Sequence, residues 1–315
     1  MNLASNIRTL FPSLRVSENA PLRDFTTFRL GGPCPLLIEG ATAAQLPAII
    51  QLLNKAGQPF LVIGQGANLV VADQGIEQAV IRFCSEKPTI KAGGNRVTVS
   101  GDTLLDDLAL FSIENEVGDL SYCTGIPGTV GGGIAGNAGA FGRQMGDHLV
   151  SVELIGLDGT VRTFLQDDLE FAYRHSKLKE TGEIVLSAIF ELPFENKEIM
   201  RRERERIIEF RREHHPDWHK EPCAGSVFRN IEPTSAVERR KAAGYFLEEA
   251  GVRAFRVGGA KIYEKHANII VADKDCTAQD VWELSEQMAA AVKDKFGIDL
   301  VREVRFLGNF QTLEN

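Results

Sequence analysis

Residues 125–142 read GIPGTVGGGIAGNAGAFG, and this stretch decides what kind of fold the chain encodes. Eight of its residues are glycine and none is charged. Ordinary turns need one or two glycines, and ordering more of them costs conformational entropy. Glycine lets backbone N–H groups approach a phosphate and lets the chain lie against a flat ring. The run therefore indicates a backbone cradle for a ligand, and GQGAN at 64–68 is a second turn of the same kind.

Three glycines of the run match a known nucleotide-binding spacing. Gly131, Gly133 and Gly136 fit G-x-G-x-x-G, which in dinucleotide-binding domains follows a buried strand and opens a helix. The preceding residues, SYCTGIPGTV, include Pro127 and two glycines and do not form an apolar strand. We interpret the match as accidental. A P-loop is excluded, because no Gly-Lys-Ser/Thr follows.

Composition indicates a globular protein of two or three domains. The chain has 315 residues, 43% hydrophobic and 25% charged. A net charge of -8 disfavours nonspecific binding to nucleic acid. No signal peptide or membrane-spanning window is evident, and the five cysteines include no C-x-x-C pair. We expect a cytoplasmic protein without disulfides or a metal site, and without nucleic-acid or membrane partners.

Local patterns predict mixed helices and strands, hence an α+β fold. Asp158-Gly159 between two apolar runs predicts a hairpin. Thr277 and Asp280 have capping-box spacing. The charged segment at 196–217 predicts a solvated helix with i,i+4 ion pairs. Helices are expected over 42–56, before Gly118, over 196–217, 244–251 and 277–297, and strands within 59–72 and over 79–83, 96–100, 149–157, 160–164, 183–192 and 300–307.

Several segments, in order along most of the chain, resemble the UDP-N-acetylenolpyruvoylglucosamine reductase family, flavoenzymes of bacterial cell-wall precursor synthesis. The matching segments are TTFRLGG (26–32), GQGANLVV (64–71), the glycine run (125–142), YRHSKLK (173–179), AGSVFRN (224–230), AGVRAFRVGGAKIYEKHANIIV (250–271) and REVRFLG (302–308).

The resemblance implies an FAD-binding domain of the flavin-oxidase (PCMH) type and a smaller α+β substrate domain. It places the FAD-binding region at 1–195, with subdomains at about 20–75 and 76–195. A charged connecting helix would follow at 196–218, and the substrate domain at 219–299. Residues 300–315 would return as a strand to the first subdomain.

The activity that the resemblance implies is the reduction of UDP-N-acetylglucosamine enolpyruvate to UDP-N-acetylmuramate, with FAD and NADPH, in peptidoglycan precursor synthesis. The protein is expected to be a monomer. FAD is expected to be non-covalent, because GQGANLVV contains no His or Cys to tether it. Residues 125–142 would wrap the cofactor, with amides facing its diphosphate.

Matching motif residues supply the expected chemistry. Arg174 in YRHS would hold the substrate carboxylate by a fixed charge. Ser226 in AGSVFRN would donate the proton, and Glu303 would lie near the developing enolate. Tyr173, Arg229 and Asn230 would bind the substrate. The expected FAD-binding residues are Gly64, Gln65, Gly66, Ala67, Asn68, Leu69, Gly125, Ile126, Pro127, Gly128, Thr129, Gly131, Gly132, Ala135, Asn137 and Gly139.

Two other functions are open to a chain with these glycine segments. One is a related flavin oxidase that uses oxygen, which AGSVFRN and EKHAN disfavour. The other is a silent nucleotide-binding regulator, which the intact Arg174, Ser226 and Glu303 disfavour. HHPDWH at 214–219 is interpreted as a loop rather than a metal site, because Pro216 breaks helical spacing. Cys223 is interpreted as inert.

The chain also departs from the family pattern. Ala67 stands where the family usually has Ser, which would remove one hydroxyl contact to the diphosphate. Extra residues are expected near 231–241, before the helix that follows. The short segment between Arg174 and the strand at 183 is typical of the family class without an inserted Tyr-bearing element.

Overall fold

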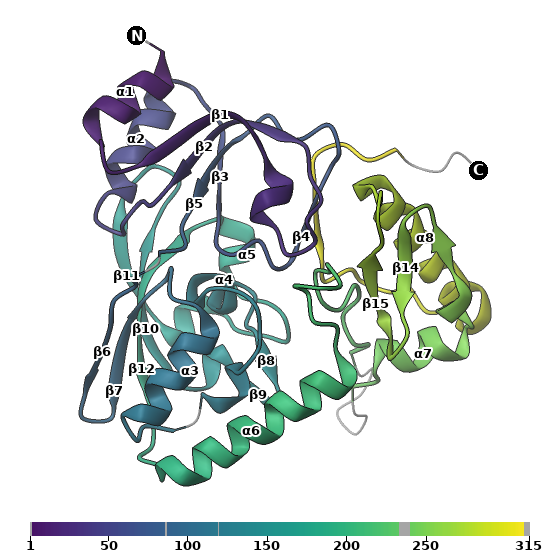
Figure 1. Cartoon of the computed structure of the whole chain (residues 1–315). Coiled ribbons are helices and arrows are strands. Elements are labelled where there is room, and N and C mark those ends of the chain that lie inside the picture. Colours follow the sequence, from purple (N-terminus) through teal and green to yellow (C-terminus); the bar gives the residue numbers. More distant parts are fainter. Residues whose placement is uncertain (1, 86, 119, 233–239, 312–315) are drawn as a thin grey trace. The chain divides into compact units, whose positions relative to one another are not determined.

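The computed structural model describes residues 2–85, 87–118, 120–232 and 240–311, and the chain forms two compact units (Figure 1). Neither unit is contiguous in sequence, because two N-terminal stretches cluster with the C-terminal third. The expected contiguous domains therefore remain a proposal. The first unit is Met1–Asn19, Pro35–Gln65 and Gln78–Phe210, and the second is Ala20–Cys34, Gly66–Glu77 and Arg211–Asn315.

A four-stranded sheet with the order β1-β2-β5-β3 begins the first unit. Strand β5 pairs in parallel with β2 on one side and with β3 on the other. The helix expected over 42–56 begins at Leu46, because Pro47 is tolerated only in the first turn. Ile7, Ile50 and Ile81 are fully buried in the core between helices and sheet. The elements are α1 (Leu3–Leu10), β1 (Arg15–Pro21), β2 (Pro33–Glu39), α2 (Leu46–Lys55), β3 (Phe60–Ile63) and β5 (Ala79–Arg82).

An antiparallel sheet with the order β11-β10-β12-β7-β6 forms the rest of this unit. The hairpin predicted at Asp158-Gly159 is confirmed, and Gly159 has the positive φ, 84°, that its turn requires. Helices α3 and α4 pack beside this sheet, and α4 contacts β7 and β12 (Figure 1). The elements are β6 (Ile90–Gly93), β7 (Arg96–Ser100), α3 (Leu105–Glu114), α4 (Val130–Ala135), β10 (Leu149–Ile155), β11 (Val161–Leu165) and β12 (Ile184–Glu191).

The charged helix α6 (Lys197–His214) is more than a solvated connector. Met200 and Ile207 are buried, so one side of the helix packs against the first unit. Arg204 forms a bidentate ion pair with Asp106 of α3, with both N–O distances 2.8 Å. Within α6, Arg201–Glu198 and Arg206–Glu203 pair at i,i+3 rather than at the expected i,i+4 spacing.

The second unit contains an antiparallel sheet, β13-β14-β15, with helices α7 and α8. The capping box predicted at Thr277 and Asp280 is confirmed at the start of α8. Apolar side chains of both helices and of β15 share one core. The elements are α7 (Ala243–Glu249), β13 (Arg256–Val257), β14 (Ala260–Tyr263), β15 (His266–Ala272) and α8 (Ala278–Phe296).

The strand expected over 300–307 is shorter in the structure. Only β16 (Arg305–Leu307) is regular, and it pairs in parallel with β4 (Leu69–Val71), which lies within the sequence range expected for the first subdomain. Upstream, the N–H groups of Glu303 and Val304 both approach the Val227 carbonyl, at 2.8 and 3.4 Å. Two donors sharing one acceptor interrupt a regular ladder. The extra residues expected near 231–241 fall largely on 233–239, outside the described residues.

The cap of α8 gives a direct stability prediction. The Thr277 hydroxyl oxygen accepts a hydrogen bond from the Asp280 N–H, 3.0 Å. Thr277→Ala should lower the free energy of unfolding by about 1 kcal/mol, because one N–H of the first turn loses its partner. Thr277→Ser keeps the hydroxyl and is the control. Denaturant unfolding measures both, and equal losses in the two variants would contradict the capping role.

Candidate functional site

The two glycine-rich segments meet in the first unit. The Gln65 side-chain oxygen accepts a hydrogen bond from the Gly128 N–H at 2.6 Å. A Cβ on Gly64 would lie 2.4 Å from the Thr129 hydroxyl oxygen, so only glycine permits this approach. The structure therefore brings together the two segments that the sequence assigned to one cofactor.

Part of the glycine run forms α4, a helix that the sequence did not indicate. Gly131 and Gly133 lie inside it and Gly136 follows its end, so these glycines do not form a strand-to-helix turn. The N–H groups of Val130 and Gly131 donate to the carbonyls of Thr103 and Gly101, both at 2.8 Å. The expectation that the run's amides face a diphosphate is wrong for these amides, since the protein itself satisfies them.

Packing explains some glycines of the run but not all. A Cβ on Gly133 would lie 3.0 Å from Leu105, and one on Gly139 would lie 2.2 Å from the Arg143 carbonyl oxygen. Gly132 differs, because it is exposed and the nearest neighbour of its Cβ would be the Thr129 hydroxyl at 3.6 Å. Glycine is a poor helix former, so its presence here is not explained by stability. This open glycine face fits a flat ring or diphosphate lying against the backbone.

The start of the run is fixed by the ion pair that holds α6. The Asp106 carboxylate, which binds Arg204, also accepts a hydrogen bond from the Gly125 N–H at 2.9 Å. Gly125 and Gly128 have positive φ values of 67° and 137°, which glycine adopts without strain. The expected ligand-binding residues Ile126 and Pro127 lie between these two glycines, and Ile126 donates its N–H to the Cys123 carbonyl.

Arg174 lies at the corner of a tight turn in the same unit. Ala172 and His175 exchange two backbone hydrogen bonds of 3.1 Å, with Tyr173 and Arg174 between them. Arg174 has a φ of 54°, in the left-handed region that usually favours Gly or Asn. For an ordinary L-residue this conformation costs roughly 1–2 kcal/mol. The guanidinium carbon lies 5.4 Å from the centre of the Tyr173 ring.

Two side-chain hydrogen bonds fasten this turn to the glycine run. The Ser176 hydroxyl donates to the Ala135 carbonyl, and the Asn137 side-chain amide donates to the Ala172 carbonyl, both at 2.8 Å. The Asn137 side-chain oxygen accepts from the Gly146 N–H at 3.1 Å. Asn137 is 1% exposed. Both polar groups of its side chain are thus bonded within the protein, and its expected contact with a cofactor remains a proposal.

Ser226 and Glu303 lie on neighbouring segments of the second unit. Ser226 forms an isolated antiparallel β-bridge with Ile269 of β15. The Glu303 N–H donates a hydrogen bond to the Val227 carbonyl oxygen at 2.8 Å. Ser226 and Glu303 are both half-buried, and Gly225 before the serine has a φ of 75°. The segment that carries Ser226 is therefore held between β15 and the chain before β16.

Sequence reasoning assigned no role to Asn268, which anchors the Ser226 segment. Its side-chain oxygen accepts a hydrogen bond from the Phe228 N–H at 3.0 Å, and its side-chain NH₂ donates one to the Phe228 carbonyl at 2.8 Å. The side chain thus takes the place of the backbone of a neighbouring strand. Asn268 is 2% exposed. The motif EKHAN carried this residue, but its partner lies forty positions away in the sequence. Thr27 likewise donates its hydroxyl to the Cys223 carbonyl, 2.8 Å.

The second half of the GQGAN turn belongs to this unit as well. Gly66 has a φ of 68°, and a Cβ there would lie 2.2 Å from the Phe25 carbonyl oxygen. The Asn68 side chain donates to the Glu303 carbonyl, 3.0 Å. Ala67 follows Gly66 in the turn, and Leu69 begins β4. One predicted cofactor-binding residue thus fixes the backbone of a predicted catalytic residue.

Two predicted substrate-binding residues follow Ser226. Arg229 is half-buried, and its Nε has no hydrogen-bond partner within the described part of the chain. An orphaned guanidinium N–H is costly in the protein interior and fits an anionic ligand. The Asn230 side-chain oxygen accepts the Ala243 N–H at 3.1 Å at the start of α7. Asn230 therefore has a structural contact in addition to its predicted one.

The histidines of HHPDWH lie in different surroundings. Burial lowers the pKa of His215 to about 4, and His219 stacks on Trp218 with ring centres 3.7 Å apart. In the described ranges, no group of three or more His, Cys, Asp or Glu side chains is placed to hold a metal ion. Burial raises the pKa of Cys223, which keeps its thiol protonated and supports the inert interpretation.

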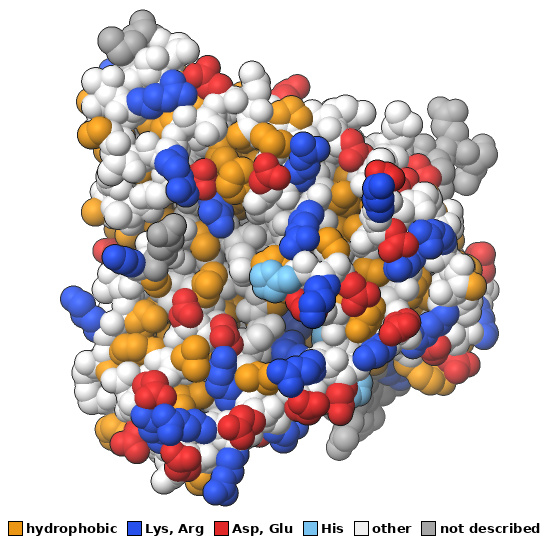
Figure 2. Space-filling model, viewed as in Figure 1, with side chains coloured by type: hydrophobic (Ala, Val, Ile, Leu, Met, Phe, Trp, Pro, Cys, Tyr) orange, Lys and Arg blue, Asp and Glu red, His pale blue; other side chains and the backbone are white. Residues whose placement is uncertain are grey.

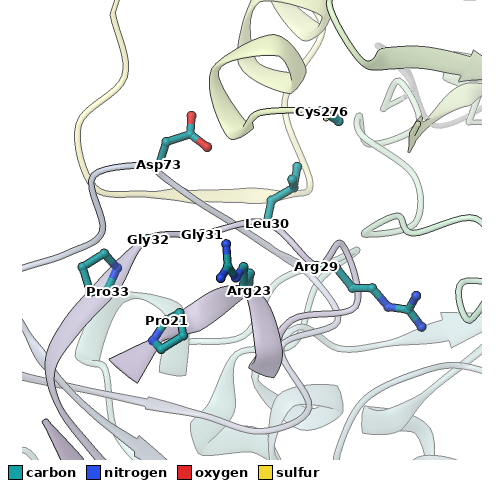
Figure 3. A pocket seen from close by; sticks show the side chains of 9 residues that line it. All are labelled: Pro21, Arg23, Arg29, Leu30, Gly31, Gly32, Pro33, Asp73 and Cys276. Atoms are coloured by element: carbon teal, nitrogen blue, oxygen red, sulfur yellow. The ribbon is translucent and has the colours of Figure 1, made fainter. Parts of the chain in front are cut away.

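A hollow of about 420 Å³ in the second unit contains none of the predicted site residues (Figure 3). Two of the charged side chains that line it, Arg29 and Asp73, have structural partners. Arg29 donates to the His219 carbonyl at 3.0 Å, and the Asp73 carboxylate accepts the N–H groups of Ala278 and Gln279. Burial and nearby carboxylates raise the pKa of Cys276 to about 12. Asp73 therefore caps the start of α8, and the Cys276 thiol stays protonated.

Basic and acidic side chains are interspersed on the face shown in Figure 2. Among the described helices, none combines the length and the hydropathy that crossing a bilayer requires.

Comparison with known proteins covers both units. Residues 216–307 match the family model of the C-terminal domain of UDP-N-acetylenolpyruvoylglucosamine reductase, and residues 35–165 match an FAD-binding domain. UDP-N-acetylenolpyruvoylglucosamine reductase 1 of Bacillus cereus is 38% identical over 296 residues, which cover 93% of this chain and 95% of that protein. The reductase of Bacillus velezensis is 32% identical over 295 residues, covering 93% and 94%.

A solved structure agrees with these matches. The crystal structure of the reductase from Thermus caldophilus has a TM-score of 0.77 and 30% identity, covering 94% of this chain and 100% of that one. The expected fold class, an α+β FAD-binding domain with a smaller second domain, is confirmed by this structure and by the FAD-binding match. With more than nine-tenths of its length aligned, the chain belongs to the UDP-N-acetylenolpyruvoylglucosamine reductase family.

Proposed function

We propose that the residues described above carry out the reduction of UDP-N-acetylglucosamine enolpyruvate to UDP-N-acetylmuramate, the reaction of this FAD- and NADPH-dependent family in peptidoglycan precursor synthesis. One observation carries the assignment of roles. The turn that bears Arg174 is hydrogen-bonded directly to the glycine run that fits a flavin. A fixed cation and a cofactor cradle are thereby parts of one rigid assembly.

Reducing an enol ether of pyruvate makes three demands. Hydride must reach the methylene carbon, the adjacent carboxylate must delocalise the negative charge that develops, and a proton must reach the α carbon. FAD, when bound, supplies the first of these by passing on hydride taken from NADPH. The exposed backbone at Gly132 and the GQGAN turn at Gly64 would hold FAD. The other two demands fall to side chains of this chain.

Arg174 meets the demand for a fixed cation. A guanidinium stays charged at all working pH values and can hold a carboxylate through two parallel hydrogen bonds. The tight turn restricts its backbone, so little reorganisation is needed as charge develops on the substrate. Tyr173, the other corner residue of the turn, would line the substrate pocket beside it.

Ser226 meets the demand for a proton donor, and Glu303 supports it. A hydroxyl is a weak acid in water, but it can protonate a strongly basic enolate when it is well positioned. The hydrogen bonds of Asn268 and Glu303 on either side hold the Ser226 segment in one conformation. Glu303 would lie near the developing enolate, and Arg229 and Asn230 would bind the substrate diphosphate.

Further properties belong to the same proposal. FAD is held without a covalent bond, since neither glycine segment offers a His or Cys. The enzyme works in the cytoplasm as a monomer, where its nucleotide substrate and NADPH are formed. The contiguous arrangement of an FAD-binding region at 1–195, a connecting helix and a substrate domain at 219–299 also remains a proposal.

A matched pair of glycine variants tests the cradle. Gly132→Ala adds a methyl group to open space, so the fold should remain intact while FAD binding weakens about tenfold or more, through 1–3 kcal/mol of overpacking against the cofactor. Gly133→Ala pushes on Leu105 and should destabilise the fold itself. Circular dichroism and fluorescence titration with FAD separate these effects. Normal FAD affinity in Gly132→Ala would exclude this face as the binding surface.

The geometry of the Arg174 guanidinium is tested by Arg174→Lys. Lysine keeps the charge but not the planar fork, so oxidation of the reduced flavin by substrate should slow by about 10–100-fold. Reduction of the flavin by NADPH should be nearly unchanged. Anaerobic stopped-flow absorbance measures the two half-reactions separately. Equal loss in both would indicate a defect in folding or in FAD binding instead.

The proton donor is tested by Ser226→Ala, which should slow turnover by about 10²–10⁴-fold while leaving FAD content and flavin reduction by NADPH near normal. Ser226→Cys should keep more activity than Ala, because a thiol is small and more acidic. In heavy water the wild type should show an isotope effect on substrate reduction alone. If Ser226→Ala turned over like the wild type, the proton would have to come from another group.

A further inference from the structure

The strained turn that carries Arg174 is held from two sides. Ser176, which is 0% exposed, donates its hydroxyl to the Ala135 carbonyl at 2.8 Å. On the other side, the amide of Asn137 donates to the Ala172 carbonyl, also at 2.8 Å. Both partners of the turn, Ala135 and Asn137, belong to the glycine run. The residues on each side of the corner are thus tied to the same short segment.

We propose that Ser176 and Asn137 are positioning residues, which keep the Arg174 turn in its left-handed conformation and in register with the flavin-binding glycine run. This inference rests on the function proposed above. Neither side chain needs to contact substrate or cofactor. Each acts through Arg174, by fixing where its guanidinium can reach.

The conformation of Arg174 explains why such anchors are needed. A non-glycine residue in an isolated turn rarely adopts a φ of 54°, so contacts with the surrounding structure must stabilise this conformation. The Ala172 carbonyl accepts both the His175 N–H and the Asn137 amide, so it closes the turn and binds it to the run. The Lys179 ammonium adds a third contact, to the Arg174 carbonyl at 2.7 Å.

Asn137 is suited to this role by two properties. Its φ of 43° lies in the left-handed region, which Asn tolerates better than most residues. Its side chain donates to Ala172 and accepts from the Gly146 N–H at the same time, which requires an amide. An aspartate could not do both while ionised. The residue type is therefore explained by the two partners that the structure gives it.

Ser176→Ala tests the proposal because it removes one hydroxyl and little else. Substrate should oxidise the reduced flavin about 10–100-fold more slowly, since a small displacement of a catalytic group has an effect of this size. FAD content and flavin reduction by NADPH should stay as in the wild type. Backbone hydrogen exchange in residues 172–176 should become faster, a readout that needs no turnover.

Ser112→Ala is the matched control. Ser112 is also 0% exposed, lies in the same unit and donates its hydroxyl to a backbone carbonyl, that of Ala109, at 2.9 Å. Among the described residues, no hydrogen bond links Ser112 to the Arg174 turn. Its loss should lower the melting temperature about as much as Ser176→Ala does, with both half-reactions unchanged. If Ser176→Ala behaves like this control, the proposal is wrong.

A double-mutant cycle shows whether Ser176 acts through Arg174. In an Arg174→Ala background, Ser176→Ala should cause no further slowing of the substrate half-reaction, because the group it positions is absent. Independent, multiplying losses would overturn the proposal. Should Ser176→Ala fail to retain FAD, Asn137→Gly takes its place, because glycine adopts a φ of 43° freely and only the amide is lost. Loss of FAD in both variants would assign the two residues to folding alone.

The same experiment separates this proposal from the function it rests on. If Arg174→Ala oxidises its reduced flavin with substrate as fast as the wild type, the proposed role of Arg174 fails, and the positioning proposal fails with it. Suppose instead that substrate oxidises the reduced flavin slowly in Arg174→Ala but at the wild-type rate in Ser176→Ala and Asn137→Gly. The proposed function then stands, and only the positioning proposal fails.

Discussion

Close backbone packing in residues 125–142 is the constraint on which the first unit depends. The Gly131 N–H bonds the Gly101 carbonyl, and a side chain at Gly64 or Gly139 would collide with a neighbouring segment. Small residues let α4 approach both the GQGAN turn and the start of β12 closely. The entropy that so many glycines lose on folding is offset by hydrogen bonds and contacts that larger residues would prevent. Gly132, which packing does not require, is left facing outward.

In the second unit, packing fixes the conformation of a short irregular segment, residues 226–229. Ser226 to Arg229 lie between β15 and residues 301–304, without a regular ladder on either side. The Asn268 side chain supplies the donor and acceptor that a regular strand would have supplied. A serine held in this way can present its hydroxyl in a fixed direction, which general acid catalysis requires. In both units, buried amide and hydroxyl side chains fix the segments that carry predicted catalytic residues.

Much of the fold was accessible from the sequence, because most elements follow local rules. The Asp158-Gly159 hairpin and the Thr277 cap were predicted from a few adjacent residues and are present. Helix α4 was missed because glycine has low helix propensity, and only its packing against Gly101 and Leu105 makes it helical. The strand before Arg305 was predicted too long because its partner, Val227, interrupts the ladder.

In the candidate site, too, local motifs could be predicted from the sequence, whereas contacts between distant residues could not. Motifs located Arg174, Ser226 and Glu303, but not the side chains that hold them. Ser176 and Asn268 have partners about forty residues away, and no local pattern reveals such a contact. Asn137 is predicted as a cofactor ligand because it lies in the glycine run, whereas the structure shows its side chain buried and bonded to Ala172 and Gly146.

In the proposed reaction, electrons from NADPH pass through the bound flavin to an enolpyruvyl group held by Arg174, Ser226 and Glu303. The most direct measurement is the flavin absorbance of the wild-type protein, reduced anaerobically with NADPH and then mixed with UDP-N-acetylglucosamine enolpyruvate. The absorbance of oxidised flavin should return without oxygen, with one UDP-N-acetylmuramate formed for each flavin oxidised. Absorbance that returned only after oxygen was admitted would rule out this reaction and indicate an oxidase.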